Sequence, residues 1–159
     1  MLIKVRVWAP AIALLVLFTS LPMAQGQTPN ATQAGIPAIR SGCENVASRA
    51  GTRVPYASPA FNKRFAACYM QRVYNWGSQE YVCLVTLWNH ESGWRVNAHN
   101  RASGAHGIPQ SLPGSKMASV GSNWYSNPFT QIRWGLKYIK HRYGTPCIAW
   151  RVWKRQKWY

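Results

Sequence analysis

The stretch SQEYVCLVTLWNHESGW, from Ser78 to Trp94, has the apolar spacing of a helix with one buried face. Its apolar residues recur three and four positions apart, at positions 81, 84, 85 and 88. Ser78 is a favourable N-cap, and Gly93 is a natural C-terminal stop. The pattern therefore predicts a helix that starts after Ser78 and ends at Gly93.

Glu91 lies at the end of this helix, three residues after Trp88 and four after Leu87, and therefore on its apolar face. Burial disfavours the charged carboxylate, and so does the negative end of the helix dipole. We therefore predict that the pKa of Glu91 is higher than the value of about 4.3 for a free glutamate. Such a carboxyl group is suited to donate a proton, as the acid of a glycosidase does. The simpler interpretation is an ion pair with a nearby Arg or Lys.

The sequence contains 19 Lys and Arg residues but only 3 acidic residues, which are Glu44, Glu80 and Glu91. The absence of Asp from the sequence excludes EF-hands, aspartic-protease dyads, kinase-type magnesium sites and Ser-His-Asp triads. His90 and Glu91 open the zinc-protease pattern H-E-x-x-H, but Trp94 stands where the second histidine would be. None of the four histidines has a partner at that spacing, so we predict neither a metal site nor a cofactor.

The first 26 residues are typical of a signal peptide, because Lys4 and Arg6 precede an apolar run that ends near Met23. The alternative is an uncleaved anchor, but two prolines interrupt the run and favour cleavage. Cleavage removes Lys4 and Arg6 and lowers the net charge from +16 to +14. We expect residues 27–42 to form a flexible leader and residues 43–159 to form one small, monomeric domain.

Four cysteines in an exported chain predict disulfides, because they lie in an oxidising compartment. No C-x-x-C spacing is present, which argues against a zinc ribbon. Three pairings are possible. We favour Cys43 with Cys68 and Cys83 with Cys147, because each link then stays within one half of the domain.

Residues 97–118 form a long loop rich in Gly and Pro, and loops of this length are usually functional or disordered. An Asn-Pro pair at 127–128 then starts a second helix, which Gly144 ends. A Thr-Pro pair at 145–146 repeats this start for a short final helix over residues 147–153. Most of the seven tryptophans from Trp88 onward should be core residues, and we expect about two to reach a cleft.

Three segments of the chain resemble, in the same order, the three motifs of soluble lytic transglycosylases. They are ESGW at 91–94, SGAHGIPQ at 103–110 and NPFTQIRWGLKYI at 127–139. The resemblance is greatest to small exported bacterial proteins that also share LPGSKMA and YG-P-C-AW, and it extends from Trp76 to Tyr159. It implies a mainly α, lysozyme-like fold with little or no sheet, and peptidoglycan as the substrate.

The same resemblance assigns roles to four residues of this chain. Glu91 takes the place of the catalytic acid, Gln110 that of a glutamine beside the cleft, and Tyr138 that of the tyrosine of the third motif. Trp150 stands where the family has a tyrosine that contacts substrate. Ile-Pro at 108–109 replaces the family's Leu-Met, and Gln replaces its Asn at position 131.

These assignments predict cleavage of the β-1,4 bond between N-acetylmuramic acid and N-acetylglucosamine. Glycosidases normally use two carboxyl groups, but Glu80 is about 16 Å from Glu91 along one helix, and Glu44 lies outside the family match. If Glu91 alone acts first as the acid and then as the base, the products should instead have 1,6-anhydromuramyl ends. The alternatives are a hydrolytic, lysozyme-like muramidase and a non-catalytic protein whose basic surface binds anionic wall polymers or nucleic acid.

Overall fold

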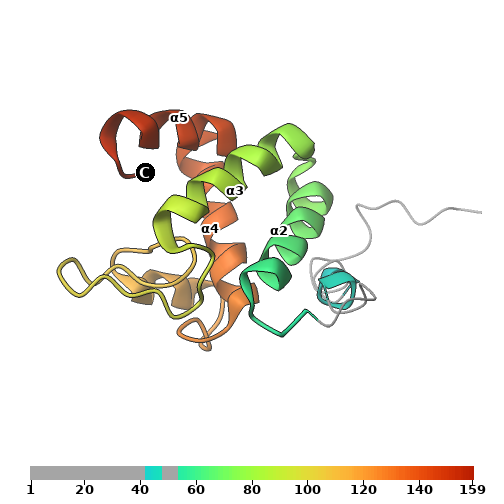
Figure 1. The fold of residues 1–159 in the computed structure, drawn as a ribbon, viewed down its shortest axis with the longest axis horizontal. Helices are drawn as coiled ribbons and strands as arrows, with labels where there is room; N and C mark the ends of the chain where they lie inside the picture. Colours follow the sequence, from blue (N-terminus) through green and yellow to red (C-terminus); the bar gives the residue numbers. More distant parts are fainter. Residues whose placement is uncertain (1–41, 48–53) are drawn as a thin grey trace, which may run out of the picture.

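The computed structural model describes residues 42–47 and 54–159, which form a mainly helical domain (Figure 1). The predicted signal peptide and all but the last residue of the predicted leader lie outside these ranges. Helix accounts for 62% of the described residues, and their only β pairing is two isolated bridges, at His99–His106 and His106–Ser111. The predicted class, a small, mainly α domain with two disulfides and no sheet, is confirmed. None of the described helices is long and apolar enough to cross a membrane.

The helices follow a short helical turn at residues 42–47. Their bounds are α2 Pro59–Tyr74, α3 Ser78–Ser92, the 3-10 helix η1 Gly114–Ser119, α4 Pro128–Tyr143 and α5 Pro146–Gln156. Figure 1 shows α3 running diagonally across the molecule, with α5 above it and α2 beside its upper end. Helix α3 packs mainly against α5, and α2 mainly against α4.

The helix predicted from the opening stretch is α3, with one correction at its start. Gly77 is the last residue with an extended backbone and therefore occupies the N-cap position. Ser78 is the first helical residue rather than the cap. No side chain caps this end of the helix. At the other end Gly93 adopts a left-handed φ of 61°, and its N–H donates to the carbonyl of Asn89, as the pattern predicts.

The Asn-Pro and Thr-Pro pairs both mark helix starts, as predicted. The Asn127 side chain accepts hydrogen bonds from the N–H groups of Phe129 and Thr130 at the start of α4. Thr145 is the cap of α5, although its side chain makes no capping bond. Helix α5 is longer than predicted, because Lys154, Arg155 and Gln156 are good helix formers that carry no apolar signal.

Helix α2 lies before the region of family resemblance, and no helix was predicted there. Its start has a local signal, since the Ser58 side chain accepts from the N–H of Phe61 and Pro59 is the first helical residue. Its buried face, which includes Phe65 and Met70, packs against α4. The core is thus shared by all four α-helices, and its largest fully buried side chains on α3 and α4 are Leu84, Leu87, Trp88, Ile132, Leu136 and Ile139.

Both disulfides have the predicted partners. Cys43 is bonded to Cys68 with a Cα–Cα distance of 5.5 Å, which attaches residues 42–47 to α2. Cys83 is bonded to Cys147 with a Cα–Cα distance of 4.9 Å, which joins α3 to the start of α5. Such bonds persist in oxidising compartments, so they fit an extracellular or secreted protein.

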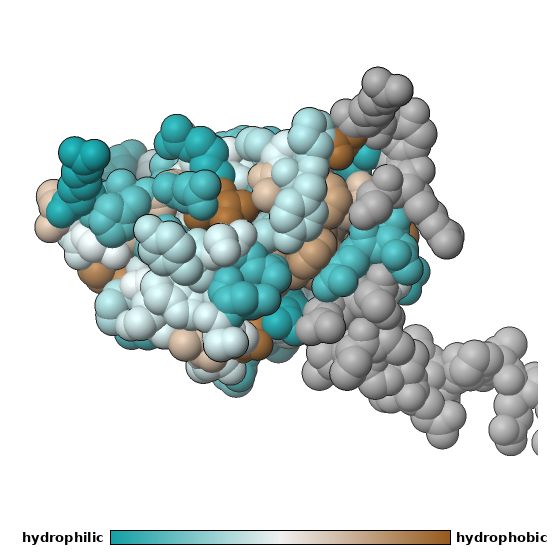
Figure 2. Space-filling view, turned by 90° about the horizontal axis from the view of Figure 1, so that it is seen from below, coloured by the Kyte–Doolittle hydropathy of each residue, from teal (hydrophilic) through white to brown (hydrophobic). Residues whose placement is uncertain are grey.

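Few large hydrophobic side chains are exposed in the described part of the chain. Figure 2 views the molecule from below and shows only small hydrophobic patches between hydrophilic residues. Examples of exposed hydrophobic residues are Leu112 and Tyr125, which are 52% and 63% exposed. Single exposed hydrophobic residues are common on protein surfaces.

Gly135 allows the Trp88 side chain of α3 to pack against the backbone of α4. A Cβ atom at this position would lie 2.6 Å from Cζ2 of Trp88 and 2.9 Å from Cβ of Pro109. Both neighbours are buried, so neither has room to move away. The glycine of the third motif, at 127–139, is therefore needed for close packing.

We expect Gly135→Ala to lower the free energy of unfolding by about 1 to 2 kcal/mol, because overpacking outweighs the better helix propensity of alanine. Urea unfolding measures the change. Lys140→Ala, an exposed position on the same helix, is the control and should change stability by less than about 0.5 kcal/mol. A Gly135→Ala variant at least as stable as the wild type would show that α4 can move away from Trp88.

Candidate active site

Glu91 lies in the last turn of α3, half-buried, with its Oε1 atom fully buried. Within the described ranges, Oε1 has no hydrogen-bond partner and no basic side chain forms an ion pair with the carboxyl group. Burial raises the pKa of Glu91 to about 7, and a hydrogen bond from the Trp153 indole lowers it only in part. The predicted direction is confirmed, and the ion-pair interpretation is not supported.

Tyr159 completes the surroundings of this carboxyl group. Its hydroxyl accepts a hydrogen bond of 2.7 Å from Nε1 of Trp88 and donates one of 3.0 Å to the carbonyl of Pro109. Burial, and then the nearby charge of Glu91, raise the pKa of Tyr159 well above its ordinary value. The hydroxyl is therefore neutral, and it connects α3, the long loop and the segment after α5.

Glu91 opens into a cavity of about 370 Å³, which is lined by Glu91, Asn100, Ser103, Ala105, Gln110, Leu112, Trp158 and Tyr159. A second cavity of about 90 Å³ shares three of these residues and adds Lys116, Trp134 and Tyr138. Because Gln110, Leu112 and Tyr159 line both, the two cavities form one groove. We call the residues of these two cavities the Glu91 groove.

Gln110 is positioned by the loop in which it lies. Its backbone is left-handed, with φ of 50°, and its amide Nε2 donates to the carbonyls of Gly107 and Ala98 at 2.9 and 3.3 Å. Gln131 supports the same loop from α4, since its Oε1 accepts from the N–H of Ile108 at 2.9 Å. Gln131, which replaces the family's asparagine, is thus a fully buried brace.

The structure brings Tyr138 to the Glu91 groove but not Trp150. The Tyr138 ring stacks on Trp134 with centroids 5.3 Å apart and planes at 9°, and both rings line the smaller cavity. Trp150 lines neither cavity and instead stacks on His90 and Trp153, with centroids 5.3 and 5.1 Å apart. Trp153, one turn later on α5, is the ring beside Glu91, and a contact between Trp150 and substrate stays a prediction.

Four residues of the site were not singled out by sequence reasoning. Tyr159 was not distinguished from the other aromatic residues of the C-terminal segment, and Trp134, Trp153 and Trp158 were among several candidate tryptophans. Trp134 and Trp158 are the two tryptophans that line the Glu91 groove. No local pattern marks them, because their positions depend on how α4 and α5 pack against the loop.

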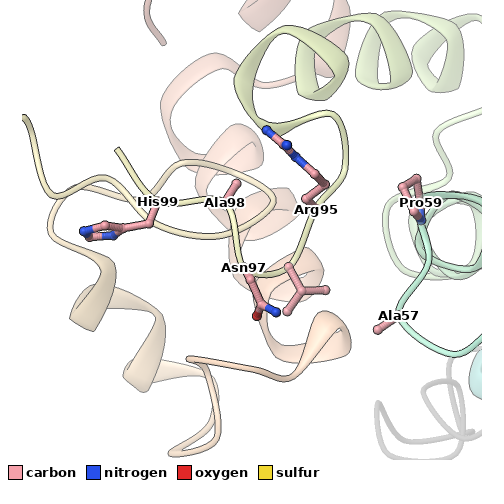
Figure 3. A pocket seen from close by; sticks show the side chains of 7 residues that line it. Ala57, Pro59, Arg95, Asn97, Ala98 and His99 are labelled. Carbon is pink, nitrogen blue, oxygen red and sulfur yellow. The ribbon is translucent and has the colours of Figure 1, made fainter. Parts of the chain in front are cut away.

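A larger cavity of about 580 Å³ shares no lining residue with the Glu91 groove, and no acidic residue lines it (Figure 3). Figure 3 shows Arg95 and Asn97 on one side of its opening, and Ala57 and Pro59 at the start of α2 on the other. The Nε of Arg95 donates to the carbonyl of Ser92 at 2.9 Å. Because no carboxyl group lines this cavity, it lacks the kind of acid that glycosidases use, which the Glu91 groove has.

The described part of the chain has no group of three or more His, Cys, Asp or Glu side chains that could hold a metal ion. Comparison with known proteins found no matching family, no matching curated protein and no matching solved structure.

We expect Glu91 to titrate near pH 7. Labelling with carboxyl-¹³C glutamate should give three side-chain NMR signals, because the sequence contains three glutamates. One signal should have its midpoint near 7 and should be absent from Glu91→Gln. Three midpoints in the ordinary range of about 4 to 5 would show that the carboxyl group is solvated.

The same shift has a consequence for stability. The pKa of Glu91 is higher in the folded state than in the unfolded state. The contribution of Glu91 to the free energy of unfolding is therefore complete below the unfolded-state pKa. It is lost as pH rises through about 7. The free energy of unfolding of Glu91→Gln should depend less on pH across this range.

We expect Tyr159→Phe to lower the free energy of unfolding by about 1 to 3 kcal/mol, because the buried Trp88 Nε1 and the Pro109 carbonyl each lose a partner. Urea unfolding measures this change, with the exposed Tyr125→Phe as control. Equal stability of the two variants would mean that water replaces the Tyr159 hydroxyl without cost.

Proposed function

We propose that this chain is an exported, lysozyme-like lytic transglycosylase that cleaves the glycan strand of peptidoglycan. The observation that carries the proposal is the Glu91 carboxyl group, whose burial raises its pKa to about 7 at the floor of an open groove. The order of the three sequence motifs supports it, and Gln110 and Tyr138 from the second and third motifs line the same groove.

In the proposed reaction, protonated Glu91 donates its proton to the oxygen that joins N-acetylmuramic acid to N-acetylglucosamine. The bond between this oxygen and C1 of the muramyl residue breaks. The muramyl C6 hydroxyl closes on C1, and its proton goes to the Glu91 carboxylate, which restores the acid. A pKa near 7 suits both halves of this cycle, because neither protonation state is strongly preferred at neutral pH.

The other carboxyl groups of the chain support a route with a single acid. Glu80 is in the first turn of α3, and its Oε2 accepts a hydrogen bond of 2.7 Å from the N–H of Cys147. Glu44 acts electrostatically on Tyr56, which lies against Phe61 near the start of α2. Neither lines the Glu91 groove. A conventional glycosidase would need a second carboxyl group within about 5 to 9.5 Å of the first.

The charge of the protein favours the same substrate. The sequence has a formal net charge of +16, and peptidoglycan with its attached polymers is anionic. A basic surface would hold the enzyme on the wall between cleavage events, more weakly at high ionic strength.

Mass spectrometry of digested, purified peptidoglycan tests the proposal. We expect muropeptides with 1,6-anhydromuramyl ends, about 18 Da lighter than reducing ends because no water is added. Activity should fall as pH rises above 7, because the proton donor is then lost. Reducing ends only would identify a hydrolase that positions a water, with Glu91 still as the acid.

Glu91→Gln should lower the rate about 10²- to 10⁴-fold, because the amide cannot donate the proton. Glu80→Gln is the matched control, since it makes the same change on the same helix, outside the groove, and it should stay active. Absence of cleavage by the folded wild type would reject the proposal in favour of a non-catalytic wall-binding protein.

A further inference from the structure

Two histidines, His99 and His106, lie opposite each other across a hairpin of the long loop, joined by an isolated antiparallel bridge. Hydrogen bonds flank this bridge on both sides, since the N–H groups of Asn100 and Gly107 donate across the hairpin at 2.9 and 2.7 Å. The histidines are therefore a non-hydrogen-bonded pair. Side chains of such a pair lie on one face of the hairpin, at the closest spacing that antiparallel backbones allow.

The ring of His106 has one nitrogen that lacks a partner. Its Nε2 lies 2.9 Å from the carbonyl oxygen of Tyr125. A carbonyl oxygen only accepts, so in the neutral ring Nε2 carries the hydrogen and Nδ1 carries a lone pair. Nδ1 is buried, with no hydrogen-bond partner among the described residues, and His106 as a whole is 3% exposed. Buried acceptors without a donor are rare in folded proteins, and a bound ligand is one way to satisfy them.

Aromatic neighbours hold the His106 ring in this orientation. Tyr125 stacks on it with centroids 4.5 Å apart and planes at 13°, and Trp124 meets it at 88° with centroids 5.6 Å apart. Turning the ring over would break the bond from Nε2 to the Tyr125 carbonyl. Histidines that bind metal ions have the same arrangement, because the nitrogen that does not bind the ion donates to a carbonyl or a carboxylate.

The spacing of the two rings fits a metal ion between them. The centroids of His99 and His106 are 5.8 Å apart, with planes at 54°. An imidazole nitrogen binds Zn²⁺ at about 2.0 to 2.1 Å, so two rings on one ion have centroids about 5 to 6 Å apart. His99 is exposed and lines the 580 Å³ cavity, so solvent reaches its ring, which points away from the guanidinium group of Arg95 (Figure 3).

The chemistry of the ligands, rather than charge, selects the ion. The formal net charge of +16 opposes the binding of any cation. Ca²⁺ and Mg²⁺ prefer oxygen ligands such as carboxylates, and residues 99–106 include no acid. Imidazole instead suits Zn²⁺, Cu²⁺ and Ni²⁺. Thiolates do not compete for these ions, because all four cysteines of the sequence are in disulfides.

We propose that His99 and His106 form a two-histidine site for Zn²⁺, with Nδ1 of His106 as one ligand and water in the remaining positions. Within the described ranges no third His, Cys, Asp or Glu joins the pair, so the ion is exchangeable, unlike a structural zinc with four protein ligands. Helical spacing did not reveal the pair in the sequence, because a hairpin rather than a helix turn brings the two rings together. The site does not depend on the proposed function.

The hairpin that carries the pair is also a wall of the Glu91 groove. Asn100, Ser103 and Ala105 lie between the two histidines in the sequence, and all three line the groove. An ion held from both sides of the hairpin restrains this wall, because it adds a link across the base of the turn. Zn²⁺ binding is therefore coupled to the shape of the groove without involving Glu91.

The test is calorimetric titration of the untagged, disulfide-bonded chain with Zn²⁺ at physiological salt, where we expect one ion per chain. His99→Ala should raise Kd at least about tenfold, because one of two protein ligands is lost. His99 is exposed, so its replacement leaves the core intact. His141→Ala removes another exposed histidine, in the last turn of α4, and should change Kd less than about twofold. No binding by the wild type, or equal effects of the two variants, would overturn the site.

Two further arms make the result specific. In imidazole ¹⁵N NMR spectra, Zn²⁺ should shift the Nδ1 signal of His106 while Nε2 keeps its hydrogen, and loss of that hydrogen would overturn the assignment of the ligand atom. Mg²⁺ should give neither heat nor a shift. Glu91→Gln should bind Zn²⁺ as the wild type does, and weaker binding would place the ion in the groove instead. Failure of the metal site and failure of the enzyme proposal are therefore seen in different assays.

Discussion

The two hydrogen bonds of the Tyr159 hydroxyl hold the site together. The Trp88 indole needs an acceptor in the core of α3, and the Pro109 carbonyl needs a donor. One hydroxyl serves both because it can accept and donate at once. The segment after α5 is thereby fixed against the end of α3, and Glu91 is enclosed between Trp153 and Tyr159 without a charged partner.

The glutamates at the two ends of α3 have opposite environments. At the start, Glu80 accepts the N–H of Cys147, beside the disulfide that joins Cys83 to Cys147, so this end is braced covalently and by a hydrogen bond. At the end, Glu91 has a buried oxygen with no partner in the described structure. Burial at this end raises the pKa of Glu91 to about 7.

Helix α4 organises the remaining surfaces. It packs on α2 and α5, Gly135 leaves room for the Trp88 side chain, and Gln131 braces the loop that carries Gln110. The stacked rings of Trp134 and Tyr138 on the same helix belong to the Glu91 groove.

The amino-acid sequence by itself determined the end of α3, both ends of α4 and the inward direction of Glu91, because caps and periodicity act over a few residues. It also favoured the correct disulfide pairing and the rise in the pKa of Glu91. Only the tertiary structure decided that Trp153 rather than Trp150 meets Glu91, and that Tyr159 joins Trp88 to the loop. Residues 88 and 159 are 71 positions apart, and their contact depends on how helices pack rather than on any local pattern.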